Sequence, residues 1–192
     1  MDATLTQPGP RAAMKDVLWR PALIVFVGNV CMMLIQMCAS RIAAPIVGVS
    51  LYTWTTIIGV MLAGISLGNF LGGKLADRFA SRRWLGAVLI LSAITTLSII
   101  VLVEEVGMRG LAQFQSPGVP LIVRMILLFA VLFGVPSIFL GLISPTVLKL
   151  ALADLTRTGS DVGRIYAAGT IGGIIGTFLT GFYLISVFGS RN

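Results

Sequence analysis

The sequence contains no histidine, and only 11% of its 192 residues are charged. The absence of histidine excludes histidine-ligated haem, most catalytic zinc sites and imidazole proton relays. A soluble domain is about one quarter charged and about half apolar, whereas 57% of this chain is hydrophobic. Because so few charges cannot cover a water-facing surface, we expect an integral membrane protein without a soluble catalytic domain. We accordingly predict no enzymatic activity, no cofactor and no metal site.

Cysteine is also scarce. Cys31 and Cys38 are the two cysteines, in one apolar stretch, and helical rise separates them by about 10 Å, too far for a disulfide. Met32, Met33 and Met37 lie beside them, and soft sulfur ligands of this kind suit Cu(I). Methionine more commonly fills gaps in a helix bundle, so we expect these side chains to pack rather than to bind metal.

The chain is rich in long apolar runs. A bilayer span needs about 20 apolar residues, and five stretches reach that length. We expect transmembrane spans at residues 21–41, 51–76, 84–103, 121–150 and 164–188. A cytoplasmic tail at 1–20 precedes them, and a short C-terminal end at 189–192 follows. The predicted fold class is therefore an all-α integral membrane protein.

Several segments are expected to interrupt or separate the spans. Ser40–Pro45 ends the first span or turns it into a short outer loop, and polar residues 104–120 and 154–163 separate the later spans. Pro136 and Pro145 lie within the fourth span, where each removes a backbone donor and predicts a kink. Carbonyl groups freed by such breaks form binding sites in transporters, although a simple packing kink is the commoner outcome.

The formal net charge of +7 comes from 14 basic and seven acidic residues. Beside apolar spans this excess indicates topology rather than nucleic-acid binding, because basic residues concentrate on the cytoplasmic side. With the N-terminus inside, the cytoplasmic segments hold ten of the 14, namely Arg11, Lys15, Arg20, Lys74, Arg78, Arg82, Arg83, Lys149, Arg157 and Arg164. The outer segments hold Arg41, Arg109, Arg124 and Arg191. We therefore expect a cytoplasmic N-terminus, an outer C-terminus and no nucleic-acid partner.

Two expected spans carry glycines at four-residue spacing. They are Gly64, Gly68 and Gly72 in the second span and Gly169, Gly172, Gly173 and Gly176 in the fifth. Small residues on one helix face let two backbones approach closely in lipid. These stripes predict helix packing inside the monomer or, alternatively, a sliding or dimerising surface. They also align at an offset of 108 residues, which fits either an internal transporter repeat or chance.

The segment between the second and third spans carries the most specific motif. A glycine, an Asp-Arg pair and a basic pair follow one another at Gly73, Asp77-Arg78 and Arg82-Arg83. Asp77 can pair with Arg78, with Arg82 or with a facing helix N-terminus. A topology-setting basic loop explains the arginines but not Asp77 or the spacing. The segment resembles the signature loop of the major facilitator superfamily, and that resemblance implies a charge cluster that closes an inward gate.

Two longer blocks resemble the membrane part of bacterial fused major-facilitator/spermidine-synthase proteins. They comprise Ala39–Pro45, Ser50–Thr55 and the glycine-rich span with its loop, and then Gly141–Pro145, Lys149–Leu152 and Val162–Ala168. The resemblance covers roughly Gln36 to Asn192. It implies a bacterial inner-membrane protein built like one half of a major facilitator superfamily transporter. In that family a sixth helix and a soluble aminopropyltransferase-like domain follow.

The chain departs from that family at two points. Members usually carry a glutamate where Gln36 stands, so a carboxylate able to bind a proton or cation is absent. The sixth helix and the synthase domain are also not encoded in these residues. We therefore expect a half-size transporter subunit for an unidentified small molecule, working as a homodimer or with a separately encoded partner. The alternative is a non-transporting membrane anchor or regulatory subunit for a spermidine-synthase-like enzyme.

Arg41 and Arg124 are the charges expected at membrane depth, toward the outer side. Ionisable residues at that depth are candidate functional sites, so the two arginines are candidate ligands for an anion. Alternatively, each reaches the outer headgroups or pairs with Glu104 or Glu105.

Two neutral polar residues of the first span are further candidate substrate ligands. Asn29 and Gln36 are seven residues apart, which places them on one helix face. We expect them to line a polar interior or to form hydrogen bonds across helices.

Overall fold

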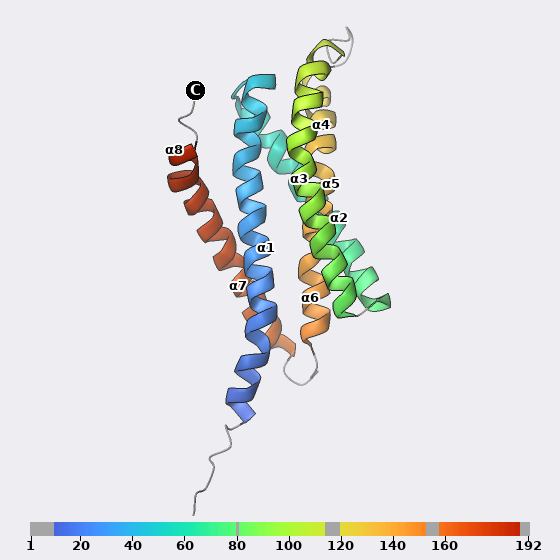
Figure 1. The fold of residues 1–192 in the computed structure, drawn as a ribbon, viewed down its shortest axis with the longest axis vertical. Coiled ribbons are helices and arrows are strands. Elements are labelled where there is room, and N and C mark those ends of the chain that lie inside the picture. Colours follow the sequence, from blue (N-terminus) through green and yellow to red (C-terminus); the bar gives the residue numbers. More distant parts are fainter. Residues whose placement is uncertain (1–9, 80, 114–119, 153–157, 189–192) are drawn as a thin grey trace, which may run out of the picture.

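The computed structural model describes residues 10–79, 81–113, 120–152 and 158–188, which form an all-helical bundle. Within these residues, five helical segments are long and apolar enough to cross a membrane. They are Trp19–Pro45, Leu51–Arg78, Arg82–Glu105, Leu121–Ala151 and Thr158–Val187, and they run roughly along the long axis of the molecule (Figure 1). The chain is therefore a multi-pass helical membrane protein.

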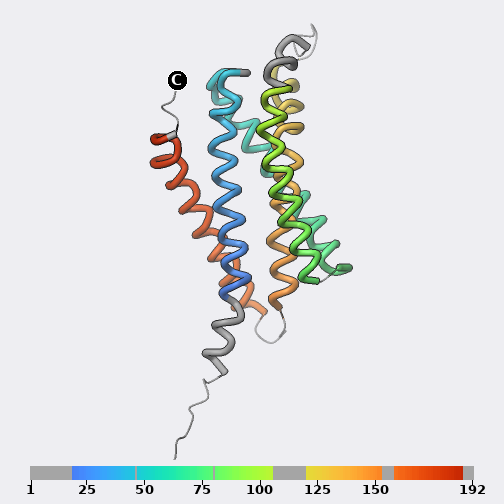
Figure 2. Tube along the Cα trace, in the orientation of Figure 1, coloured from blue at the N-terminus to red at the C-terminus, as the bar shows by residue number. Residues whose placement is uncertain are grey.

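The bundle is built from the following elements. The first three spans are single helices, α1 (Pro10–Val47), α2 (Leu51–Arg78) and α3 (Arg82–Gln113). The fourth comprises α4 (Leu121–Phe129), the π-helical turn η1 (Ala130–Gly134), α5 (Val135–Gly141) and α6 (Ile143–Ala151). The fifth comprises α7 (Thr158–Phe178), the π-helical turn η3 (Leu179–Leu184) and α8 (Ile185–Phe188). In the view of Figure 2, α1, α3 and α7 ascend, while α2 and the fourth span descend.

The first span is longer than the sequence predicts. Helix α1 begins at Pro10, inside the predicted tail, because proline is well tolerated at a helix start where no donor is needed. Ser40–Pro45 is helical rather than a loop, and the apolar span ends at Pro45 while the helix itself continues to Val47. Pro45 removes one backbone donor close to the helix end, where the loss costs little. The helix stops instead before Gly48, whose φ of 77° favours glycine.

Two polar segments between spans also differ from expectation. Helix α3 continues to Gln113, so the first part of the predicted polar segment at 104–120 is helical. Helix α7 begins at Thr158, inside the linker predicted at 154–163. Residues 114–119 and 153–157 of these two segments lie outside the described part of the chain.

Glycines hold α2 tightly against α5 and α6. A Cβ atom at Gly68 would collide with the carbonyl oxygen of Ile138, and one at Gly72 would lie 2.6 Å from Cγ of Pro145. The two helical segments descend together, and their contacts keep one register. Gly64 meets Ser137, Gly68 meets Gly141 and Gly72 meets Pro145, each pair 73 residues apart.

A second glycine stripe holds α7 against α1. A Cβ atom at Gly172 would collide with the carbonyl oxygen of Phe26, and one at Gly176 would lie 2.9 Å from that of Val30. Gly173, by contrast, is only at ordinary van der Waals distance from α1, 3.8 Å. Both stripes are thus occupied by contacts inside the monomer. Beyond them α7 and α8 lean away from α1 toward the C-terminus (Figures 1 and 2).

The fourth span breaks at its two prolines. The π-helical turn η1 ends immediately before Val135 and Pro136, and α5 ends four residues before Pro145. The hydroxyl that follows each proline donates a hydrogen bond back along the helix. Ser137 Oγ donates to the carbonyl of Phe133 at 2.6 Å, and Thr146 Oγ1 donates to that of Leu142 at 2.7 Å. These hydroxyls are buried, so the bonds also satisfy polar atoms that would be costly in lipid.

The core lies in two parts along the bundle. One is built from Ile57, Met61, Phe129, Leu132 and Phe133, all fully buried. The other is built from Val25, Val88, Leu142, Ile143, Val147 and Ile165. Large apolar side chains also cover the outside, with Phe182 77% exposed and Leu51 80% exposed. A bilayer is the solvent that such a surface requires.

The contacts of Gly68 predict a strong effect of a single methyl group. Gly68→Ala should destabilise the protein by about 1–3 kcal/mol, because the opposing carbonyl belongs to a helix backbone and cannot move aside. A lower midpoint of thermal unfolding in detergent would report the loss. Gly59→Ala is the matched control on the same helix, since its Cβ would meet nothing within 4 Å. Equal stability of the two variants would contradict the close approach of α2 and α5.

Candidate functional site

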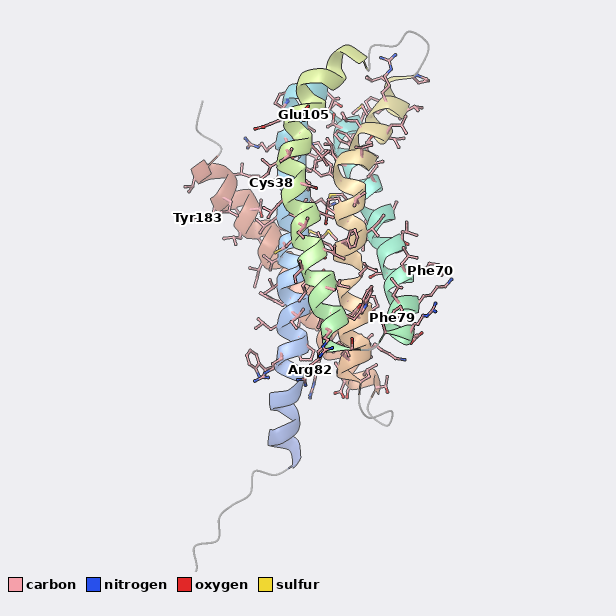
Figure 3. All side chains as sticks on the ribbon, turned by 45° about the vertical axis from the view of Figure 1, so that its right-hand side comes forward. Cys38, Phe70, Phe79, Arg82, Glu105 and Tyr183 are labelled. Atoms are coloured by element: carbon pink, nitrogen blue, oxygen red, sulfur yellow. The ribbon has the colours of Figure 1, made fainter. Side chains whose placement is uncertain are left out.

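The loop between α2 and α3 lies at one end of the bundle. Arg78 ends α2, and Ser81 begins the next helix by accepting a hydrogen bond from the amide of Trp84 at 3.1 Å. The ring of Phe79 lies 5.7 Å from that of Trp84, centroid to centroid. Figure 3 shows Phe79 and Arg82 at this end, beside the lower end of α6. The described residues on either side of this short connection are exposed, and one aromatic contact joins the two helix ends.

Asp77 forms an ion pair across two spans. Lys149 Nζ, in the last turn of α6, donates to Asp77 Oδ1 at 2.7 Å. The partner is thus neither Arg78 nor Arg82 nor a helix N-terminus, which were the partners the sequence suggested. The pair extends the packing register of the glycines by one turn, with a separation of 72 residues. Both side chains are well exposed, Asp77 by 70% and Lys149 by 49%.

Other cations of the loop rest on aromatic rings. Lys74 Nζ lies 4.3 Å from the ring centroid of Phe70, and the guanidinium of Arg78 lies 5.6 Å from that of Phe79. Both are cation–π contacts at exposed positions. Arg82 and Arg83 are exposed, and a Cβ atom at Gly73 would meet nothing within 4 Å. The loop thus presents a basic surface around one ion pair.

A polar cavity of about 210 Å³ lies between the two glycine-packed helix groups. Its polar lining comes from four helical elements, with Asn29 on α1, Asn69 on α2, Ser144 on α6, and Tyr166 and Thr170 on α7. Asn69 lies nine residues before Arg78 and Ser144 seven before Ala151, the lower ends of their spans. At the helical rise, those separations correspond to about 10–14 Å. The cavity therefore lies within the depth of the bilayer.

Part of this polar lining has no partner. The Asn29 amide donates to the carbonyl of Val25 at 2.9 Å, and Thr170 Oγ1 donates to that of Tyr166 at 3.0 Å. The side chains of Asn69, Ser144 and Tyr166 make no hydrogen bond to any part of the chain that the structure describes. Unpaired polar groups are costly in hydrocarbon. Asn69 and Tyr166 are exposed and Ser144 is half-buried, so these groups are accessible, and the space is large enough for about seven waters or a small hydrogen-bonding solute.

Charged side chains are not part of the described cavity lining. Tyr166 is the one ionisable group there, and amides and hydroxyls supply the other polar atoms. Asn29 also packs closely on α7, since a Cβ atom at Gly169 would lie 3.0 Å from its Nδ2. This chemistry suits a neutral solute that donates and accepts hydrogen bonds.

The remaining candidate residues lie elsewhere. Gln36 is half-buried on α1, two turns beyond Asn29, and does not line the cavity. Arg41 is exposed near the upper end of α1, and Arg124 is half-buried near the start of α4. The structure therefore joins Asn29 to the cavity and leaves both arginines outside it.

Sequence reasoning missed four of the five polar lining residues, and local signals existed for three of them. Asn69 directly follows a glycine of the α2 stripe, and Tyr166 and Thr170 are four residues apart, on one helical face. Ser144 lies directly before Pro145, where the sequence predicts a kink, but neither periodicity nor a glycine stripe indicates that its side chain faces a cavity.

The described residues contain no group of three or more cysteine, aspartate or glutamate side chains that could hold a metal ion. Cys31 and Cys38 are free thiols.

Comparisons of the chain with protein-family models, with curated proteins and with solved structures find no match.

The ion pair between Asp77 and Lys149 predicts a small, salt-dependent contribution to stability. Lys149→Asp places two carboxylates together and should lower the unfolding midpoint, while the charge swap Asp77→Lys with Lys149→Asp should restore most of it. Because both groups are exposed, we expect the coupling to be less than about 1 kcal/mol and to vanish at high salt. Glu104→Gln, at an exposed acid outside this pair, is the control. A swap no more stable than Lys149→Asp alone would exclude the pair.

Proposed function

We propose that this chain is a half-size, major-facilitator-like transporter subunit for a small neutral solute. The polar cavity at membrane depth supports the proposal, because three unpaired side chains from three different helices converge there. Asn69, Ser144 and Tyr166 would exchange hydrogen bonds with a solute that has left water. No charged lining residue would attract an ion.

The division of the bundle into two glycine-packed groups also supports transport. One group joins α1 to α7 and the other joins α2 to α5 and α6, and the cavity lies where they meet. Each group is close-packed within itself. In alternating access, rigid helix groups rock around a fixed site near the midplane. This chain would supply one side of that movement, with a second copy or a separately encoded protein supplying the other.

The loop after α2 would act at the cytoplasmic end. In the structure the pair between Asp77 and Lys149 joins helices that glycines already hold together, so it stiffens one group rather than crossing the cavity. The exposed arginines of this chain, Arg82 and Arg83, would therefore make the gating contact. Their partners would lie on the other half of the transporter. The excess of basic residues at this end supports a cytoplasmic orientation in a bacterial inner membrane.

The second candidate is a membrane anchor for a spermidine-synthase-like enzyme. The cavity chemistry favours it in one respect, because a polyamine is a cation and the described cavity lining offers no carboxylate. A link to polyamine chemistry, as the sequence blocks suggest, would then come through a partner enzyme rather than through transport.

Water access to the cavity tests the proposal directly. In a background of Cys31→Ser and Cys38→Ser, we expect Asn69→Cys to react with a charged, membrane-impermeant methanethiosulfonate at least about ten-fold faster than Ile94→Cys. Ile94 is 57% exposed on α3 but does not line the cavity, and a thiol in lipid forms little of the reactive thiolate. Equal rates would show that the cavity is dry and would end the proposal.

Uptake into proteoliposomes separates the two candidates. With the full chain reconstituted, we expect uptake of labelled glycerol or xylitol and none of putrescine, since the described cavity lining lacks a carboxylate. Asn69→Leu should reduce that uptake, and Ile94→Leu should not. Rapid labelling of Asn69→Cys together with no uptake of any probe would exclude a transporter built from copies of this chain alone.

A further inference from the structure

A second space, of about 600 Å³, lies on the other side of α1. Helix α1 forms one wall with Leu23, Val27 and Cys31, helix α3 forms the other, and Leu140 and Ile143 of the fourth span form the floor. Figure 1 looks toward this region, with α6 visible between α1 and α3. The lining is almost entirely apolar, and the volume lies within the usual range of ligand sites.

The groove matches one leaflet of a bilayer in length. Its α1 wall runs from Leu23 to Cys31 and its α3 wall from Leu89 to Leu97, which is about 12 Å in each case. Half of a bilayer hydrocarbon core is about 15 Å. Small side chains on the α3 wall leave room in the groove, since Ser92, Ala93 and Thr96 line it.

Two arginines lie at the foot of the groove walls. Arg20 precedes Leu23 by three residues and Val27 by seven, so helical periodicity places it on the same face of α1. Arg82 precedes Leu89 by seven residues and Ala93 by eleven, so it lies on the groove face of α3. Both arginines are exposed, and Figure 3 shows Arg82 at the lower end of α3.

We propose that this groove binds an anionic phospholipid, with an acyl chain between α1 and α3 and the phosphate beside Arg20 and Arg82. Guanidinium groups form paired hydrogen bonds with phosphate oxygens, and long basic side chains reach the headgroup layer. Bilayer lipid is also the phase onto which the groove opens. The site shares Gly28, Leu140 and Ile143 with the lining of the polar cavity but lies on another face of α1, and it does not depend on a transport function.

The headgroup half of the proposal can be measured by fluorescence quenching. The full chain, in a Trp54→Phe background, keeps Trp19 and Trp84 near the foot of the groove. In phosphatidylcholine vesicles, a minor fraction of brominated phosphatidylglycerol should quench them more than the same fraction of brominated phosphatidylcholine. Arg20→Gln and Arg82→Gln should each reduce this preference roughly five-fold. Arg41→Gln, an exposed arginine near the other end of α1, should leave it unchanged.

The acyl-chain half needs its own variants. Ala93→Phe should fill the groove and abolish the preference for phosphatidylglycerol, whereas Ile94→Phe, on the neighbouring face outside the groove, should not. Cys31→Phe, from the opposite wall, gives the same test if Ala93→Phe does not fold. Equal quenching by the two brominated lipids in the parent protein would overturn the proposal. The proposal would also be overturned if the arginine variants reduced the preference for phosphatidylglycerol while neither phenylalanine variant did. That result would indicate a basic surface without a groove site.

Discussion

The close approach of helix backbones at glycine is the constraint on which the rest of the structure depends. In lipid, apolar side chains gain little by leaving one apolar surface for another, so association relies on close packing. Gly68 against Ile138 and Gly172 against Phe26 bring backbone to backbone. These contacts fix two tight helix groups and their internal registers. The position of Asp77 beside Lys149 follows from the first register, because the pair lies one turn beyond the last glycine contact.

The two glycine-packed helix groups are tight within themselves but leave two open spaces beside them. Where the groups meet, the side chains of Asn69 and Tyr166 are left facing a polar cavity, and on the far side of α1 an apolar groove opens toward α3. The two spaces share Gly28, Leu140 and Ile143 in their linings yet differ in chemistry. One suits groups that exchange hydrogen bonds, and the other suits hydrocarbon. A single helix, α1, thus has a polar and an apolar space on its two sides.

Much of the fold could be predicted from the sequence, because length and apolarity decide a bilayer span without any tertiary contact. Which span packs against which could not be predicted. The four-residue spacing of Gly64 and Gly68 shows that they share one helix face, but it does not show which helix packs against that face. The ion pair of Asp77 was missed for the same reason, as Lys149 is brought near only by the packing register. Of the cavity residues, Asn29 was proposed from the pattern of one helix. A kink beside Ser144 was predicted from Pro145, but which helices its side chain would face depends on how the fourth span packs against α1 and α7.

The parallel course of α2 and the fourth span has an electrostatic consequence. Two helices that descend together end together, so the partial negative charges of two carboxyl-terminal helix ends lie side by side. Arg78 occupies the last turn of α2, and Lys149 occupies that of α6. These cations therefore lie where they can compensate the aligned helix macrodipoles. Part of the positive charge at this end is thus favoured by the direction of the helices, and this contribution is the same whichever way the protein faces.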